Sequence, residues 1–238
     1  MSLRARIEKA RVATAPAQAQ TARGGLLAFV GAKQGQGATE AEIADTIASG
    51  AAAQGIAGVA LQSLSPRGLA CTQGCAFCCI LRGEDGGTIT EAEARGLHAA
   101  LAPLKGAPDG RSWAQGACAA LDPETRSCRA YAARPMICRT YVSSDVSACE
   151  KVAEGQAAEG PGTLGPYHTY LAALGLSRAA LKGVRRVATY SLSKLTAAAI
   201  DGMDTDAALA AARHKPAGLD DELRRSKRDL ERARQAGL

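Results

Sequence analysis

The residues of this chain with the clearest chemistry are its eight cysteines. All of them fall within one third of the chain, at Cys71, Cys75, Cys78, Cys79, Cys118, Cys128, Cys138 and Cys149. Cysteines that only filled a core would be scattered, so this clustering favours a shared chemical role. The N-terminus lacks the apolar stretch of a secretory signal, and we therefore expect a cytoplasmic, reducing environment. In such a compartment, clustered cysteines are typical of metal ligands or redox groups rather than disulfides.

The first four cysteines form the tight motif Cys71-x3-Cys75-x2-Cys78-Cys79. Gaps of two and three residues let successive thiolates converge on one centre from a single turn. The adjacent side chains of Cys78 and Cys79 tend to diverge, so at most one of them fits that centre easily. The other is left for a second site or as a spare thiol.

The remaining four cysteines lie about ten residues apart and must come from separate local elements. Eight thiolates can therefore make two four-thiolate sites, or one such site plus thiols with other duties. A four-thiolate set suits zinc or an iron–sulfur cluster, and ligand type alone does not separate these cofactors. We favour iron–sulfur, because vicinal and widely distributed ligands suit a multi-metal 4Fe-4S cluster. The histidines, which lie outside the tight clusters and which we expect to be surface or cap residues, are His98, His168 and His214.

The tight motif also raises an enzymatic alternative. The segment 71–78, Cys-Thr-Gln-Gly-Cys-Ala-Phe-Cys, resembles the three-cysteine signature of radical S-adenosylmethionine enzymes. In those enzymes, three thiolates leave one iron of a four-iron cluster open to S-adenosylmethionine. That chemistry is carried on a βα barrel, and this Ala-rich chain lacks the alternating strands and helices of a barrel. A methyltransferase-like enzyme carrying a cluster would need a nucleotide-binding loop, but the glycines of 31–37 fit a linker better.

The downstream cysteines stand in a longer and more specific pattern. It consists of Cys-Ala-Ala-Leu-Asp at 118–122 and Cys-Arg-Ala-Tyr-Ala-Ala-Arg-Pro-Met-Ile-Cys-Arg-Thr-Tyr at 128–141. Together with the CxxxCxxCC run, this pattern resembles the YkgJ-type cysteine-cluster family of zinc- or iron-chelating proteins. The resemblance covers residues 70–150 and implies a metal-binding protein whose cofactor is an iron–sulfur cluster or zinc. A related cysteine domain occurs in flagellin lysine methylases, which resemble iron–sulfur proteins.

The non-cysteine residues of the same pattern suit a buried anionic centre. Several thiolates around one metal leave negative charge that is costly to bury without hydrogen-bond donors. Arg134 and Arg139 lie near Cys138 in the sequence, and we expect them to donate charge-assisted hydrogen bonds to the centre. Pairing of both arginines with surface carboxylates is the alternative. The aromatic residues that we expect to shield the centre from water are Phe77, Trp113, Tyr131 and Tyr141.

The elements that must position these residues are predicted to be helical. Aromatic residues make up only 3% of the chain, so Ala, Leu and Val must fill the core. Ala is the best helix former, and strand-favouring residues are scarce. We predict a mainly α fold in which a small irregular, metal-centred cysteine domain is flanked by helices. The expected division is a helical N-terminal extension over 1–59, a cysteine-cluster metal-binding domain over 60–150 and a C-terminal helical region over 151–238.

Local signals set the expected helix boundaries. The Thr-x-x-Glu spacing at 39–42 and 90–93 is typical of a capping box. The first box predicts a helix through Ala53, and the second predicts a helix that stops before Pro103. The other expected segments are a helix over 3–22 ended by Gly24 and Gly25, a glycine-rich loop over 31–37, an irregular stretch over 103–128, a connection over 150–166, and helices over 167–174, 178–200, 204–213 and 220–236.

The net charge of +6 and the pI near 9.0 are mildly basic. The positive charge lies largely in the last third of the chain, where we expect a solvated helix face rather than a nucleic-acid surface. No apolar run in the sequence is long enough to span a membrane. The expected role is redox chemistry, metal handling or support of a partner enzyme. The remaining hypothesis is an interaction module with structural zinc, whose basic C-terminal helix docks a protein partner.

Overall fold

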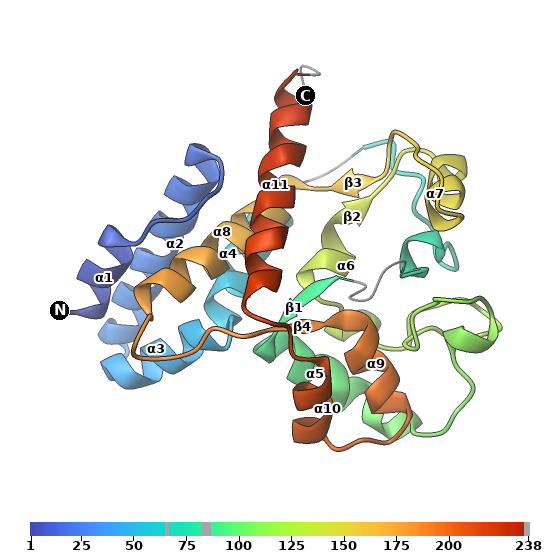
Figure 1. Ribbon diagram of the computed structural model, residues 1–238, viewed down its shortest axis with the longest axis horizontal. Coiled ribbons are helices and arrows are strands. Elements are labelled where there is room, and N and C mark those ends of the chain that lie inside the picture. Colours follow the sequence, from blue (N-terminus) through green and yellow to red (C-terminus); the bar gives the residue numbers. More distant parts are fainter. Residues whose placement is uncertain (65–66, 82–86, 236–238) are drawn as a thin grey trace. The chain divides into compact units, whose positions relative to one another are not determined.

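The computed structural model describes residues 1–64, 67–81 and 87–235. The chain forms two compact units, a helical unit and a cysteine unit. The helical unit comprises Met1–Leu64, Gly165–Thr189 and Lys215–Leu238, and the cysteine unit comprises Ser65–Leu164 and Tyr190–His214. The described part contains eleven α-helices and four strands of two or three residues (Figure 1). The predicted fold class, mainly α with helices flanking the cysteine-rich region, is confirmed. Among the described helices, none combines the length and the hydropathy that crossing a bilayer requires.

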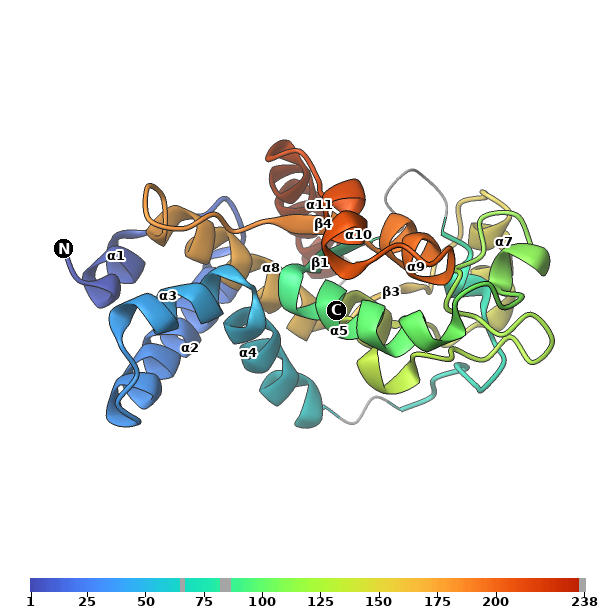
Figure 2. The same ribbon diagram turned by 90° about the horizontal axis from the view of Figure 1, so that it is seen from below.

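Six described helices build the helical unit around one buried helix. They are α1 (Leu3–Lys9), α2 (Pro16–Gly35), α3 (Glu40–Ala48), α4 (Ala51–Gln62), α8 (Gly165–Ala180) and α11 (Ala217–Gln235). Helix α8 is apolar on nearly all sides, which is typical of a helix enclosed by others. It packs against α1, α2, α4 and α11 (Figures 1 and 2). Tyr170, Leu171 and Leu174 of α8 are completely buried and form the centre of this unit's core.

The predicted helix over 3–22 is in fact two helices. Helix α1 ends at Lys9 and α2 begins at Pro16. Proline inside a helix would remove a backbone hydrogen bond and clash with the preceding turn, whereas in the first turn its fixed φ is favourable. The proline therefore separates the two helices.

Helix α2 continues through the glycines that were expected to break a helix. The prediction of an interruption at Gly24 and Gly25 is wrong, and so is most of the predicted loop over 31–37, since α2 runs to Gly35. The buried residues of its inner face, spaced four apart, are Ala22, Leu26 and Val30. Burial of this face offsets the unfavourable helix propensity of glycine.

The boundary between α3 and α4 is set by a cap and a glycine. The Thr39 hydroxyl accepts a hydrogen bond from Glu42 N, and the Glu42 carboxylate accepts one from Thr39 N. This capping box confirms the predicted helix start. The predicted end at Ala53 is wrong, because Gly50 adopts a left-handed φ of 85° and separates α3 from α4. Glycine reaches this conformation without a Cβ clash.

The cysteine unit combines short helices with two very small sheets. Its helices are α5 (Glu91–Leu101), α6 (Met136–Thr140), α7 (Val146–Ala153), α9 (Leu192–Ile200) and α10 (Thr205–Ala212), with 3-10 turns η1 (Phe77–Cys79), η2 (Ala102–Leu104), η3 (Gly110–Ser112) and η4 (Tyr131–Ala133). Strands β1 (Thr88–Thr90) and β4 (Thr189–Ser191) pair, and β2 (Tyr141–Val142) pairs antiparallel with β3 (Gly162–Thr163). Helices α5, α9 and α10 pack together and support the irregular remainder (Figure 2).

Several predicted boundaries in this unit are confirmed. Helix α5 begins at the Thr-x-x-Glu capping box and ends at Leu101, before Pro103. Loops and short 3-10 turns fill 103–128, as expected of an irregular stretch. The predicted connection over 150–166 is partly wrong, since α7 extends to Ala153 and β3 pairs with β2.

The predicted single helix over 178–200 is wrong. Helix α8 ends at Ala180, and a turn with Gly183 at a φ of 79° leads to β4 and α9. The Ser191 hydroxyl accepts a hydrogen bond from Lys194 N and thereby caps a new helix start. A capping serine inside an apolar stretch thus separates elements that periodicity alone would join.

Two of the three histidines are buried. The prediction that they are surface or cap residues is wrong for His98 and His168, each only 5% exposed. His98 Nε2 lies 2.9 Å from Met203 O, at the approach to α10. His168 Nδ1 lies 2.8 Å from Ser226 Oγ on α11. Each imidazole therefore links its helix to a segment distant in the sequence.

The neighbouring glycines of α2 offer a matched test of close helix packing. A Cβ at Gly25 would lie 2.8 Å from Ile56 Cγ2 on α4, whereas one at Gly24 would have open space. We expect Gly25→Ala to lower the free energy of unfolding by about 1–3 kcal/mol through overpacking. Gly24→Ala should raise it by up to about 1 kcal/mol, because alanine loses less backbone entropy in a helix. Denaturant unfolding measures both changes, and equal shifts would contradict the close contact of α2 with α4.

Candidate metal centre

The tight four-cysteine motif forms an irregular turn that ends in η1. Cys79 N donates to Ala76 O at 2.9 Å and closes the last part of this turn. Gly74, at a left-handed φ of 79°, lies so close to Thr125 that a Cβ would be 3.2 Å from the Thr125 carbonyl oxygen. This approach holds the motif against the segment that leads to Cys128.

Main-chain hydrogen bonds join the motif to Cys118. Cys118 N donates to Cys79 O at 2.8 Å, and Leu81 N donates to Gly116 O at 2.7 Å. The two segments therefore run antiparallel, with a bridge between neighbouring residues. Cys118 is only 8% exposed.

Cys128 lies on the returning side of a tight turn. Leu121 and Cys128 form an antiparallel bridge, and Asp122 N donates to Ser127 O at 2.9 Å. The Asp122 carboxylate accepts a hydrogen bond from Thr125 N at 2.8 Å within the same turn. The aspartate of the Cys-Ala-Ala-Leu-Asp element thus holds the turn that brings Cys128 back toward Cys118.

Cys138 lies on α6, which a buried carboxylate ties to α5. Met136 N donates to Glu93 Oε1 at 2.7 Å. The other oxygen of Glu93 accepts hydrogen bonds from Thr90 N at 2.9 Å and from the Thr90 hydroxyl at 3.0 Å. Glu93 is 3% exposed, and these donors compensate the loss of water. The carboxylate therefore fixes the start of both helices and with them the position of Cys138.

Four thiols from these separate segments influence one another, and we call them the inner cysteine set: Cys79, Cys118, Cys128 and Cys138. Burial raises the pKa of Cys118 to about 11 and also raises the pKa of Cys128 and Cys138. The charges of Cys118 and Cys128 raise the pKa of Cys138 further. The charges of Cys118 and Cys138 likewise act on Cys79. Repulsion of this kind indicates that these thiols lie near one another, and Cys78 acts on Cys79 and Cys138 in the same direction.

Two of the other four thiols contact Ser143, and we call these four the outer cysteine set: Cys71, Cys75, Cys78 and Cys149. Cys71 Sγ donates to Ser143 O at 3.8 Å, and the Ser143 side chain forms a hydrogen bond with Cys149. Burial raises the pKa of Cys149, and the charges of the other three thiols add to this shift.

The adjacent Cys78 and Cys79 lie where the two sets meet. The Cys79 thiol donates a hydrogen bond to the Cys78 sulfur, which lowers the pKa of Cys78 to about 7 and raises that of Cys79. Cys78 is exposed, whereas Cys79 is half-buried. The two neighbouring side chains are thus in contact with each other but have different surroundings.

Arg134 is the predicted arginine that lies near the thiols. Its charge acts on Cys78 and Cys128 in the direction that lowers the pKa of each. Its guanidinium carbon also lies 3.5 Å from the centroid of the Tyr131 ring, in a cation–π contact. Tyr131 itself is 65% exposed, and Arg139 is exposed as well.

Tyr141 is the predicted aromatic residue beside the outer cysteines. It is half-buried where α6 passes into β2. Burial raises the pKa of Tyr141, and the charges of Cys149 and Cys78 raise it further. Phe77 and Trp113 are also half-buried.

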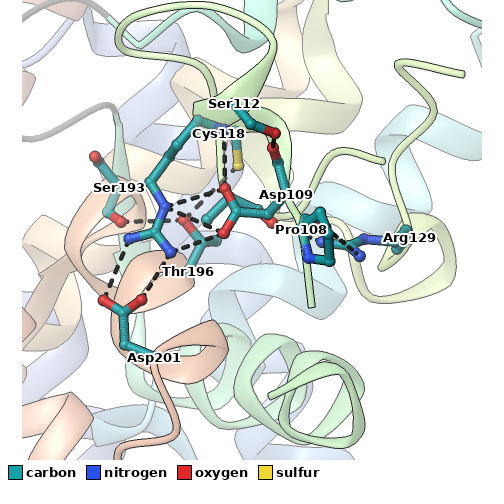
Figure 3. A network of polar contacts seen from close by, with 10 residues as sticks. Pro108, Asp109, Ser112, Cys118, Arg129, Ser193, Thr196 and Asp201 are labelled. Carbon is teal, nitrogen blue, oxygen red and sulfur yellow. Dashed lines mark hydrogen bonds and ion pairs between the residues drawn. The ribbon is translucent and has the colours of Figure 1, made fainter. Parts of the chain in front are cut away.

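Residues that sequence reasoning missed surround Cys118 (Figure 3). Cys118 Sγ lies 3.8 Å from the Thr196 hydroxyl, which donates to Ser193 O at 3.0 Å. The hydroxyl lowers the Cys118 pKa that burial raises. Thr196 lies on α9, far from Cys118 in the sequence, so no local pattern could have indicated this contact.

A network of charged side chains lies next to the loop that leads to Cys118 (Figure 3). Arg111 Nη2 pairs with Asp109 and with Asp201, each at 2.7 Å. The Asp109 side chain is 6% exposed. Burial alone would raise the pKa of Asp109, but the hydrogen bonds from Arg111 hold it below the ordinary value of 3.8. The network ties the loop before Cys118 to the end of α9.

All eight cysteines are free thiols. Within the described parts of the chain, no three His, Cys, Asp or Glu side chains converge closely enough to form a complete metal site. Fold and site together define a mainly α protein with free cysteines gathered on an irregular region.

Residues 70–158 match the model of the CxxCxxCC family, described as a "putative zinc- or iron-chelating domain". The predicted resemblance of this segment to the YkgJ-type cysteine-cluster family is thus confirmed, and the cofactor class named for that family is zinc or iron. In this chain the first gap of the motif holds three residues, since the run is Cys71-x3-Cys75. No curated protein and no solved structure matches the chain.

The close approach of η3 to the cysteine loop can be tested at Gly110. A Cβ there would overlap the Cys118 carbonyl oxygen and lie 2.9 Å from Leu121 Cβ. Because these atoms cannot rotate away, we expect Gly110→Ala to lower the free energy of unfolding by about 1–3 kcal/mol. Gly96→Ala on the exposed face of α5, where a Cβ meets open space, is the control and should not destabilise. A Gly110→Ala variant as stable as the control in thermal unfolding would contradict the contact.

The Asp109–Arg111 pair predicts a defined acid sensitivity. A carboxylate with a depressed folded pKa stabilises the fold above its unfolded pKa, and this contribution is lost as pH falls through the folded value. Asp109→Asn lacks the contribution at every pH. The stability gap between wild type and Asp109→Asn should therefore shrink as pH falls below about 4. Urea unfolding at several pH values measures this gap, with the exposed Asp229→Asn as control. A stability gap that does not change with pH would contradict the lowered pKa of Asp109 in the folded protein.

Proposed function

We propose that the segment 70–158 holds a thiolate-ligated metal centre whose ligands are the inner cysteine set, Cys79, Cys118, Cys128 and Cys138. The observation that carries the proposal is the meeting of four free thiols from four separate segments in one partly buried region. Thiolate sulfur is the ligand that zinc and iron–sulfur clusters use. The family model that matches this segment agrees with that cofactor class.

The electrostatic surroundings of the inner cysteine set favour a bound cation. Each of these thiols resists ionisation because burial, a hydrogen bond or neighbouring thiolates oppose its negative charge. A metal replaces the thiol protons and compensates the charge, so metal and proton compete for the same sulfurs. Binding one ion would require movement of the cysteine side chains, because no three ligand side chains of the described residues converge on one point.

Arg129 adds a second, independent indication. Its Nε is buried and has no hydrogen-bond partner within the described chain. The rest of its guanidinium donates to Pro108 O at 3.0 Å and to Ala119 O at 3.3 Å. These hydrogen bonds fix the group beside the turn that joins Leu121 to Cys128. The Arg129 charge also acts on Cys128 in the direction that lowers the pKa of this thiol. A sulfur ligand or cluster sulfide is an acceptor of the kind that this N–H lacks.

We favour a 4Fe-4S cluster over zinc, because the ligands are distributed over several loops and include one of a vicinal pair. A bound cluster would supply one-electron redox chemistry. The chain's own residues would exclude water around Cys118 and place the Arg129 and Arg134 charges near the thiolates. The role is then electron transfer, or metal handling, or support of a partner enzyme, and eight free thiols fit the reducing cytoplasm.

The test is metal and sulfide analysis of the full chain purified without oxygen. We expect iron with labile sulfide and broad visible absorption, both lost in Cys118→Ala/Cys138→Ala. Gly96→Ala, which lies on the exposed face of α5 and leaves every thiol in place, is the control that should retain the cofactor. Stoichiometric zinc without iron would overturn the choice of cluster but keep the thiolate centre. A wild-type protein with neither metal, even after anaerobic reconstitution with each, would overturn the proposal itself.

A further inference from the structure

A cavity of about 470 Å³ lies within the helical unit. Its lining comes from the turn that follows α1, from the last turn of α8 with the residues after it, and from the start of α11. A cavity of this size is typical of sites that hold small organic molecules. None of the eight cysteines lines it, so a ligand bound here would be separate from the proposed metal centre.

Part of the cavity lining is apolar. The residues of this part are Val12, Ala13, Gly175, Ala179, Pro216 and Leu223. A Cβ at Gly175 would overlap Val12 Cγ2 and lie 3.0 Å from Leu223 Cδ1. The glycine therefore lets the turn after α1 and helix α11 both pack closely on α8. Together these residues offer apolar surface that the hydrocarbon part of a ligand can cover.

The rest of the lining is charged, and its cations outnumber its carboxylates. The charged residues are Arg11, Arg178, Lys182, Arg224 and Asp220. Two of the four cations already have carboxylate partners. Arg178 pairs with Asp220 and also donates to Pro216 O at 2.9 Å, and Arg224 pairs with Asp221. The other two cations, Arg11 and Lys182, therefore give the cavity its positive charge.

Arg11 and Lys182 form no ion pair with a carboxylate in the part of the chain that the structure describes. Arg11 Nη1 donates to two carbonyl oxygens, Lys9 O at 3.1 Å and Ala10 O at 3.2 Å. These hydrogen bonds hold the guanidinium beside its own turn but leave its charge without a counter-charge. Uncompensated positive charge next to apolar surface favours a ligand that is anionic at one end and apolar at the other.

We propose that this cavity binds a small organic phosphate monoester. Its phosphate pairs with Arg11 and Lys182, and its organic group covers the apolar lining beside Val12 and Leu223. A phosphate monoester carries about −1.5 to −2 charge at pH 7, which matches two cations without carboxylate partners. Arginine offers a planar fork of N–H donors and lysine a compact charge, and both side chains bind phosphate. A carboxylate, with a single charge, would leave one of the two cations uncompensated.

The experiment is isothermal titration calorimetry of the full chain with phenyl phosphate, and with phenol, inorganic phosphate and benzoate as comparison probes. We expect one phenyl phosphate per chain and weaker binding of the other three probes. Arg11→Gln/Lys182→Gln should weaken the binding of phenyl phosphate by about tenfold or more, because its charge-assisted hydrogen bonds are lost. The matched control, Arg186→Gln/Arg232→Gln, removes two exposed cations that do not line the cavity and should bind like the wild type. All four substituted side chains are exposed, so both variants should fold, which circular dichroism checks.

Several results would contradict the proposal. A wild type that does not bind phenyl phosphate at millimolar concentration would overturn the site. Equal weakening in the cavity variant and in the control would mean that phenyl phosphate responds to net charge and not to this cavity. Inorganic phosphate or phenol that binds as tightly as phenyl phosphate would overturn the division into a charged and an apolar part. Benzoate that binds as tightly would overturn the choice of a phosphate ligand.

Discussion

The backbone hydrogen bond from Cys118 N to Cys79 O is the contact on which the arrangement of thiols depends. This hydrogen bond joins the tight motif to the downstream cysteines. The spacing of cysteines within the motif could not have indicated this contact. Close approaches at Gly74 and Gly110 surround this contact, since a Cβ at Gly74 would press on Thr125 and one at Gly110 would overlap the Cys118 carbonyl. Glycine at these two positions lets backbone segments approach closely. This close packing holds the irregular loops that contain the cysteines.

A buried carboxylate provides the second fixed point of the same unit. Glu93 accepts hydrogen bonds at the start of α5 and of α6, and it thereby relates Cys138 to the packed helices α5, α9 and α10. Burying this charge is tolerated because backbone and hydroxyl donors surround it. On the outer side Ser143 has the corresponding role for Cys71 and Cys149. These polar anchors add to an apolar core in which Leu97, Leu101 and Met136 are buried, and bound metal would add to both.

The helical unit is organised around one buried helix. Its centre is α8, whose Tyr170 and Leu171 are completely buried. Close packing of helices, with Gly25 against Ile56, supplies most of the contacts, and the His168–Ser226 hydrogen bond satisfies polar groups in the interior. This unit therefore has an apolar core of its own, whereas the thiols belong to the cysteine unit.

The sequence by itself determined the helical class, both capping boxes and the family that 70–158 matches, because these depend on composition and on residues a few positions apart. It also predicted that the cysteines act together, but it left their grouping open. Tertiary structure decided that Gly50 ends a helix while Gly25 does not, that His98 is buried, and that Thr196 contacts Cys118. These outcomes come from contacts between residues far apart in the chain. The spacing of neighbouring residues does not indicate such contacts. The adjacent Cys78 and Cys79 have different neighbours only because the segment 118–149 folds around them.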